Sequence, residues 1–169
     1  MVNTVDELQK EIEALREQLN EYEQIIIDIS APIIPSIVPE TILVPVTGIL
    51  LPERFERIIS KLLNYCSGKE ITTVVLDFSA ISKKEIGDLD IFGHYINNLT
   101  ASLNLVGVEV MYVGFSPSIT QNLIISGLST DAEIKTFMSF KKALQFLMKQ
   151  KGLEMQGFYI PACLSYNRF

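Results

Sequence analysis

Apolar residues recur at alternating spacings of three and four along the first 29 residues of the chain. With Val5 and Leu8 assigned to heptad positions a and d, the pattern continues without a break. The a and d residues are Val5, Leu8, Ile12, Leu15, Leu19, Tyr22, Ile26 and Ile29. So narrow a stripe predicts a helix over residues 1–29 that forms a parallel homodimeric coiled coil; a single amphipathic helix packed on its own domain is the alternative.

The pattern changes at Ser30 to proline and β-branched residues. The run APIIPSIVPETILVPVTG predicts two short strands with a turn around Pro39 and Glu40. Prolines in the first strand restrict it to a sheet edge, because each one removes a backbone donor. We expect the second strand over residues 42–47. Pro52 then opens a helix that ends at Gly68.

An uninterrupted β-branched and aromatic run lies at the centre of the chain. Val74, Val75, Leu76 and Phe78 predict a strand that is buried on both faces, in the middle of a sheet. Residues 79–87 are polar and predict a connecting loop. Asp88 or Asp90 then occupies the N-cap position of a helix that ends near Asn104.

The remaining pattern repeats this alternation of strand and helix. A strand is predicted over residues 108–113, a helix from Ser116 to Leu128, a strand over residues 133–137, and a helix that Ser139 caps and that ends near Lys151. This order predicts an α/β fold: a mixed sheet with four helices packed against it, preceded by the N-terminal coiled-coil helix. The predicted units are residues 1–29, a domain over residues 30–151 and a tail over residues 152–169, for which packing and disorder are both open.

Charge is distributed unevenly along the 169 residues. Residues 1–28 carry eight acids and two bases, a net of −6, which equals the net charge of the whole chain. The domain is therefore balanced, with no basic stripe, and nucleic-acid binding is not expected. Prolines interrupt the most apolar stretch and no basic-then-apolar leader opens the chain, so we expect a cytoplasmic protein that does not enter a membrane.

Several segments together resemble a known family: APIIPSIVPETILVPVTG, LPERFERIISKLL, TTVVLDFSAI and GVEVMYVGFSPSITQNL. Over residues 27–150 the chain resembles a STAS domain, and within that family it is most similar to the RsbR-type co-antagonists of the bacterial stressosome. The resemblance implies a non-enzymatic anti-sigma factor antagonist-like regulator. Its implied partners are other STAS proteins in a larger assembly and a switch serine/threonine kinase.

The resemblance also implies two regulatory regions, and the sequence departs from the family at the first. Family members carry a phosphorylatable Ser or Thr at the start of the helix after the central strand. Here that place reads Gly87, Asp88, Leu89 and Asp90, and no Ser or Thr occurs between Ser82 and Thr100. The second region contains Ser116, Ser118, Thr120 and Asn122, with Asn122 at the matching position. We interpret the acids as permanent charge near a helix N-terminus, where a phosphate would lie.

Other chemistry is less well supported by the residues. Asp77, Asp88 and Asp90 have the residue type of a magnesium site, but the second strand-end acid and the Lys of a phosphorelay enzyme are missing. His94 is the only histidine and is expected on a helix surface. Cys66 and Cys163 are expected as reduced thiols. No catalytic, cofactor or metal-binding residue is therefore predicted, and the alternative function is a sensor of a small ligand or nucleotide on the STAS fold.

Overall fold

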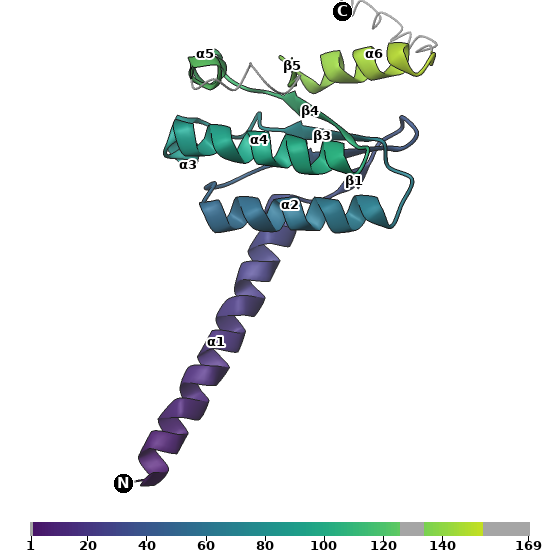
Figure 1. Cartoon of the computed structure of the whole chain (residues 1–169). Helices are drawn as coiled ribbons and strands as arrows, with labels where there is room; N and C mark the ends of the chain where they lie inside the picture. Colours follow the sequence, from purple (N-terminus) through teal and green to yellow (C-terminus); the bar gives the residue numbers. More distant parts are fainter. Residues whose placement is uncertain (1, 126–133, 154–169) are drawn as a thin grey trace, which may run out of the picture.

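The computed structural model describes residues 2–125 and 134–153. Helix α1 (Val2–Ser30) projects as a single rod from a layered α/β domain (Figure 1). None of the helices in these residues is both long enough and apolar enough to cross a membrane.

A five-stranded sheet forms the middle layer, with its strands in sequence order. The strands are β1 (Ile34–Pro35), β2 (Thr41–Pro45), β3 (Thr73–Asp77), β4 (Glu109–Val113) and β5 (Lys135–Phe137). β1 pairs antiparallel with β2 at the edge, as its prolines predict, and the remaining neighbours are parallel. The sheet is therefore mixed, and the carboxyl ends of β2 to β5 share one side.

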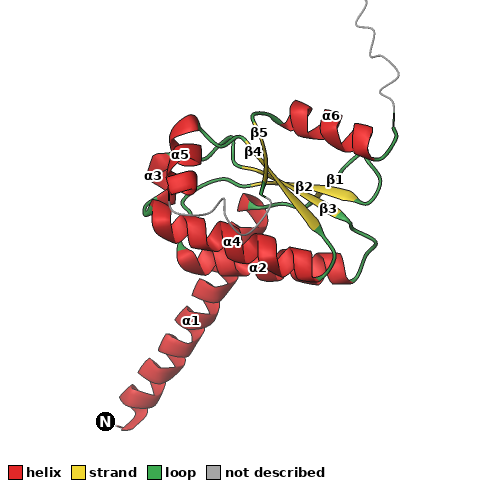
Figure 2. Cartoon of the chain, turned by 45° about the horizontal axis from the view of Figure 1, so that its top comes forward, coloured by secondary structure: helices red, strands yellow, loops and turns green. Residues whose placement is uncertain are grey.

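Helices cover both faces of this sheet. They are α2 (Pro52–Ser67), α3 (Lys83–Ile86), α4 (Leu89–Leu105), α5 (Pro117–Ile125) and α6 (Phe140–Gln150). α2 and α4 lie side by side on one face, and α6 crosses the other (Figures 1 and 2). The predicted fold class is confirmed. The described domain contains one helix more than the four predicted, because α3 occupies the stretch that we expected to be a loop.

Successive side chains of each strand point to opposite faces of the sheet, so the buried residues form two clusters. The larger one lies between the sheet and helices α2 and α4, and Ile42, Val74 and Tyr112 contribute to it. The smaller lies under α6, with Val75, Met111 and Leu147. β3 contributes to both: Val74, Val75 and Leu76 are each at most 1% exposed, so the prediction of a strand buried on both faces is confirmed.

Candidate functional site

The predicted regulatory residues gather where β3 and β4 end. Residues 87–90 lead into α4 and residues 116–120 begin α5, and we call these two segments together the helix-start surface. The two helices contact each other, and both begin at the same end of the domain (Figures 1 and 2). The topology therefore places two stretches about 30 residues apart in sequence on one surface, at the strand ends where open α/β sheets usually carry their sites.

Asp88 is the N-cap of α4. Its Oδ1 accepts from the backbone N–H of Asp90 at 2.9 Å and of Ile91 at 3.3 Å. These bonds satisfy two donors that the first helical turn leaves without partners, and a carboxylate there is favoured by the helix dipole. Gly87 precedes it with φ of 69°, which a side chain would strain. Asp88 and Asp90 are both exposed, so their charges face solvent.

The short helix α3 lies immediately before this cap. Ser82 and Glu85 form a capping box, in which a Glu85 carboxylate oxygen accepts from the Ser82 backbone N–H at 2.8 Å and from its hydroxyl. These hydrogen bonds from Ser82 lower the pKa of Glu85. The Glu85 carbonyl also accepts from the backbone N–H of Leu50 at 2.8 Å. Helix α3 is thus held by its own cap and by the loop after β2.

The start of α5 presents hydroxyl groups where α4 presents carboxylates. Ser116 Oγ accepts from the Ile119 backbone N–H at 3.4 Å and lies 3.0 Å from Ser118 Oγ. Thr120 donates its hydroxyl to the Ser116 carbonyl at 3.2 Å. Ser118 is exposed, and Ser116 and Thr120 are half-buried. Asn122 lies in α5, but its side chain is outside the described part of the chain.

A cluster of aromatic rings packs between the starts of α4 and α5 and the ends of β3 and β4. The Phe92 ring of α4 lies 5.8 Å from that of Phe78, which follows β3, and 6.0 Å from that of Phe115, which precedes α5. Phe78 and Phe115 are 5.1 Å apart. Such aromatic pairs contribute beyond their buried area. The two parts of the helix-start surface therefore rest on one shared cluster.

A close backbone approach holds the strand ends together under this surface. Gly114 follows β4 with φ of 80°, and a Cβ atom there would overlap Ser79, which follows β3. The Phe78 backbone N–H also donates to the Val113 carbonyl at 2.8 Å. The ends of β3 and β4 are thus fixed next to each other, which fixes the spacing of the two helix starts.

Helix α1 meets the domain at α2 through two ion pairs. Arg57 contacts Glu23 at 2.6 Å and Lys61 contacts Asp28 at 2.9 Å. Lys61 also donates to the Ala31 carbonyl at 3.2 Å, just after α1 ends. The a and d side chains of α1 are left uncovered, with exposed fractions between 48% and 73%; they are Val5, Leu8, Ile12, Leu15, Leu19, Tyr22, Ile26 and Ile29.

Tyr112, Cys66 and His94 lie away from the helix starts or show no catalytic partner among the described residues. Tyr112 is buried, its hydroxyl is 2.7 Å from Thr100 Oγ1, and burial raises its pKa. Burial likewise raises the pKa of the Cys66 thiol, whereas Cys163 lies outside the described residues. His94 is exposed on α4. Within residues 2–125 and 134–153, no group of three His, Cys, Asp or Glu side chains could hold a metal ion.

Sequence reasoning located both helix starts but did not place them on one surface, and it missed two further features. The Ser82–Glu85 capping box was readable from the spacing Ser-x-x-Glu, which marks a helix N-terminus. The ion pairs from Arg57 and Lys61 to α1 had no local signal, because their partners lie more than 30 residues away.

Comparison with solved structures places the domain in a known class. The chain resembles a variant of RsbS from Moorella thermoacetica with a TM-score of 0.59 and 20% identity, covering 73% of this chain and 98% of that one. It also resembles a chain from the structure titled "Molecular architecture of the stressosome, a signal integration and transduction hub", with a TM-score of 0.56, 18% identity and coverage of 71% and 98%. The fold is that of STAS-domain proteins.

Sequence comparison gives a more particular likeness. The chain is 28% identical to the RsbT co-antagonist protein RsbRB of Bacillus subtilis (strain 168) over 72% of its own length. It is 29% identical to RsbRD of the same organism over 75%. The chain thus has the fold of STAS-domain proteins and is similar in sequence to the RsbR-type co-antagonists. It spans 42% and 44% of these relatives, respectively, and no protein-family model matches it.

Proposed function

We propose that this protein is a non-enzymatic regulator in a stressosome-type assembly, where it contacts other STAS proteins and a switch kinase through the helix-start surface. The relatives named as co-antagonists support this role, as does the resemblance to a stressosome chain. In this role the protein is a scaffold whose surface chemistry sets the affinity of a partner.

One observation carries the specific form of the proposal. The α4 start, where the family is phosphorylated, has an N-cap carboxylate at Asp88 and a second exposed carboxylate at Asp90. Phosphorylation adds about −1.5 to −2 charge near a helix N-terminus. Two carboxylates supply comparable charge permanently. The surface therefore resembles the modified state and cannot be switched at α4.

Phosphate mapping tests this form of the proposal. The full chain is incubated with a switch kinase and ATP, and its peptides are examined by mass spectrometry. We expect no phosphate on residues 83–99, because this stretch contains no Ser or Thr. A variant with Asp90→Thr serves as the matched control and should become a substrate. Phosphate on residues 83–99 of the unaltered chain, or an Asp90→Thr variant that stays unmodified, would contradict the proposal.

Homodimerisation through α1 is the second part of the proposal. The side of α1 that carries Gln24 and Asp28 faces α2, with Asp28 bonded to Lys61. At 3.6 residues per turn, the a and d positions lie on roughly the other side of the helix. The joint borders the last heptad of the seam, where Glu23 pairs with Arg57 and Ile26 lies beside Leu51. The a and d side chains from Val5 to Tyr22 are 48–62% exposed, so a second copy of α1 can cover them. Each Leu or Ile buried in this way contributes about 1.5–3 kcal/mol.

A pair of charge-matched variants tests this dimer. Leu15→Asp places a carboxylate at a d position, whereas Asn20→Asp adds the same charge at an outward b position. We expect the unaltered chain and Asn20→Asp to sediment as dimers and Leu15→Asp as a monomer. Equal masses for Leu15→Asp and the unaltered chain would refute dimerisation through the seam and leave the α4 proposal to its own test.

A further inference from the structure

The two faces of the sheet are covered unequally. On the face under α2 and α4, the β2 side chains Ile42 and Val44 are each 1% exposed. On the opposite face, Leu43 and Pro45 are only half-buried. Ile34 pairs with Leu43 across the β1–β2 ladder, and it is 43% exposed. Part of the second face therefore lacks a cover near β1 and β2.

Helix α6 borders this uncovered region. Phe146 packs on Phe137 of β5, with ring centroids 5.2 Å apart, whereas Lys151 reaches the β1–β2 turn. At 100° per residue, Leu144 and Met148 lie in the same row of the helix as Lys151, away from Phe146. Both are half-buried. We call the apolar region formed by Ile34, Leu43, Pro45, Leu144 and Met148 the open face.

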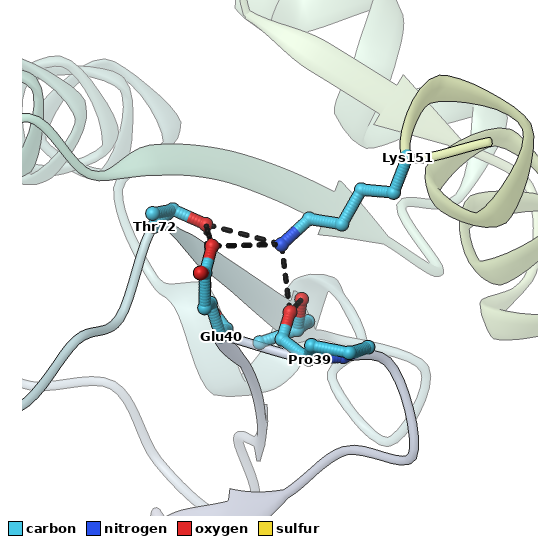
Figure 3. Close-up of polar contacts among 5 residues, drawn as sticks. Pro39, Glu40, Thr72 and Lys151 are labelled. Carbon is cyan, nitrogen blue, oxygen red and sulfur yellow. Dashed lines mark hydrogen bonds and ion pairs between the residues drawn. The ribbon is translucent and has the colours of Figure 1, made fainter. Parts of the chain in front are cut away.

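The chain leaves α6 beside this open face. Lys151 Nζ donates to the Pro39 carbonyl at 2.6 Å and to Thr72 Oγ1 at 3.2 Å, and it pairs with Glu40 at 3.4 Å (Figure 3). These partners come immediately before β2 and β3. The end of α6 is therefore fixed at the amino ends of the strands, next to the turn that connects β1 to β2.

The backbone then turns off the helix axis. Gly152 has φ of 68°, and the Leu153 N–H donates to the Met148 carbonyl at 2.8 Å. This bond from the residue after a left-handed glycine is the Schellman arrangement, which ends a helix and redirects the chain. Because Met148 belongs to the open face, the residues after Leu153 begin at its border.

The sequence that follows has the composition of a buried segment. Residues 154–169 read EMQGFYIPACLSYNRF, with one acid and one base and with apolar side chains at nine positions. Its most apolar run, Phe158 to Leu164, contains no charged, amide, Ser or Thr side chain. We propose that residues 155–164 lie across the open face of the same chain and complete the second layer of the domain.

The length of residues 155–164 and their covalent link to α6 favour this segment as the cover of the open face. Ten residues in extended form span about 33 Å, and a strand of five residues is about 17 Å long. The segment is therefore long enough to cross the face from the end of α6. A segment joined to its site by a short linker has an effective concentration in the millimolar range, which exceeds that of a free second copy in dilute solution. The proposed contact between the segment and the open face requires neither kinase binding nor assembly with other STAS proteins.

The test measures how fast a thiol on the open face is alkylated. Ile34→Cys in the full chain places a thiol there, and Leu105→Cys, 87% exposed at the end of α4, serves as the control site. Each cysteine variant is made with the unaltered tail and with two altered tails. One altered tail carries Phe158→Asp and Ile160→Asp within the proposed segment. The other carries Ser165→Asp and Asn167→Asp, which add the same charge outside residues 155–164. Mass spectrometry of peptides follows each cysteine separately, and slow labelling of buried Cys66 reports an intact fold.

We expect Cys at position 34 to be labelled about tenfold more slowly in the chain with an unaltered tail than with the Phe158 and Ile160 substitutions. The Ser165 and Asn167 substitutions should leave that protection in place, and labelling at position 105 should be equal in all chains. Equal rates at position 34 with either tail would overturn the proposal. Protection that disappears on dilution would also overturn it, because the occupant would then be a second copy.

Discussion

The starts of α4 and α5 lie on one surface and rest on the same aromatic cluster, but they carry different chemistry. α4 begins with the carboxylate of Asp88 bonded to two backbone N–H groups, at 2.9 and 3.3 Å. α5 begins with Ser116, whose single cap bond to a backbone N–H is 3.4 Å long. A carboxylate cap carries its charge at all times, whereas a hydroxyl acquires charge only by modification. Two neighbouring helix starts can therefore carry a permanent charge and a variable charge on one surface.

This difference also separates stability from regulation. At α4 the same carboxylate both caps the helix and contributes to the surface charge. At α5 a hydroxyl group acquires charge only on modification, so the surface charge can change there. We expect any phosphate added to the helix-start surface to lie on residues 116–120.

The largest stability effect is expected from removing the α4 cap. Asp88→Ala leaves two first-turn donors without their partner and should lower the free energy of unfolding by about 1 kcal/mol. Ser116→Ala should cost less than about 0.5 kcal/mol, because the bond it removes is long and partly exposed. Chemical denaturation of both variants measures the difference.

Asp88→Asn is the matched control, because asparagine caps as well as aspartate but carries no charge. It should keep most of the stability that Asp88→Ala loses. If Asp88→Ala and Ser116→Ala cost the same, the two helix starts would be energetically equivalent, and the comparison would fail.

A smaller, pH-dependent effect is expected at α3. Hydrogen bonds from Ser82 hold the pKa of Glu85 below its ordinary value of 4.5. The unfolded chain therefore binds this proton more readily than the folded one. The stabilisation is complete above the ordinary pKa and is lost as the pH falls through the lowered pKa of the folded state. The advantage of the unaltered chain over Glu85→Gln in unfolding free energy should shrink from neutral pH to strongly acidic pH.

Ser82→Ala removes the hydroxyl that donates to Glu85, and it should reduce the same acid-dependent contribution. A constant difference between the unaltered chain and Glu85→Gln over the whole pH range would show that the capping box does not stabilise the carboxylate form.

Local patterns were sufficient to predict the main elements and to limit the N-cap of α4 to Asp88 or Asp90, of which the structure has Asp88. The apolar run before Phe78 defined the central strand, and the acid before an apolar helical pattern located the start of α4. Helix α3 was missed because four residues are too short to show helical periodicity. Its position also depends on the bond from Leu50, a contact that a local pattern does not show.

The ion pairs between α1 and α2 could not be predicted from local sequence patterns either. Arg57 and Lys61 read as exposed residues of an amphipathic helix, and only the fold brings them to Glu23 and Asp28. The heptad stripe correctly predicted a helix with an apolar seam. The partner that covers this seam remains a prediction, because a single chain shows its a and d side chains uncovered.

We propose that Asp88 and Asp90 hold the helix-start surface in a state that binds a switch kinase weakly. The most direct measurement is a titration of labelled kinase with the full chain and with a variant carrying Asp88→Ala and Asp90→Thr, at low and at high salt. We expect the variant to bind about tenfold more tightly, with a smaller gain at high salt because ions screen exposed charges. A variant with Glu13→Gln and Glu17→Gln loses the same charge on α1 and should bind as the unaltered chain does. Equal affinities of the unaltered chain and the Asp88/Asp90 variant at both salt concentrations would contradict the claim and reduce the two acids to ordinary helix caps.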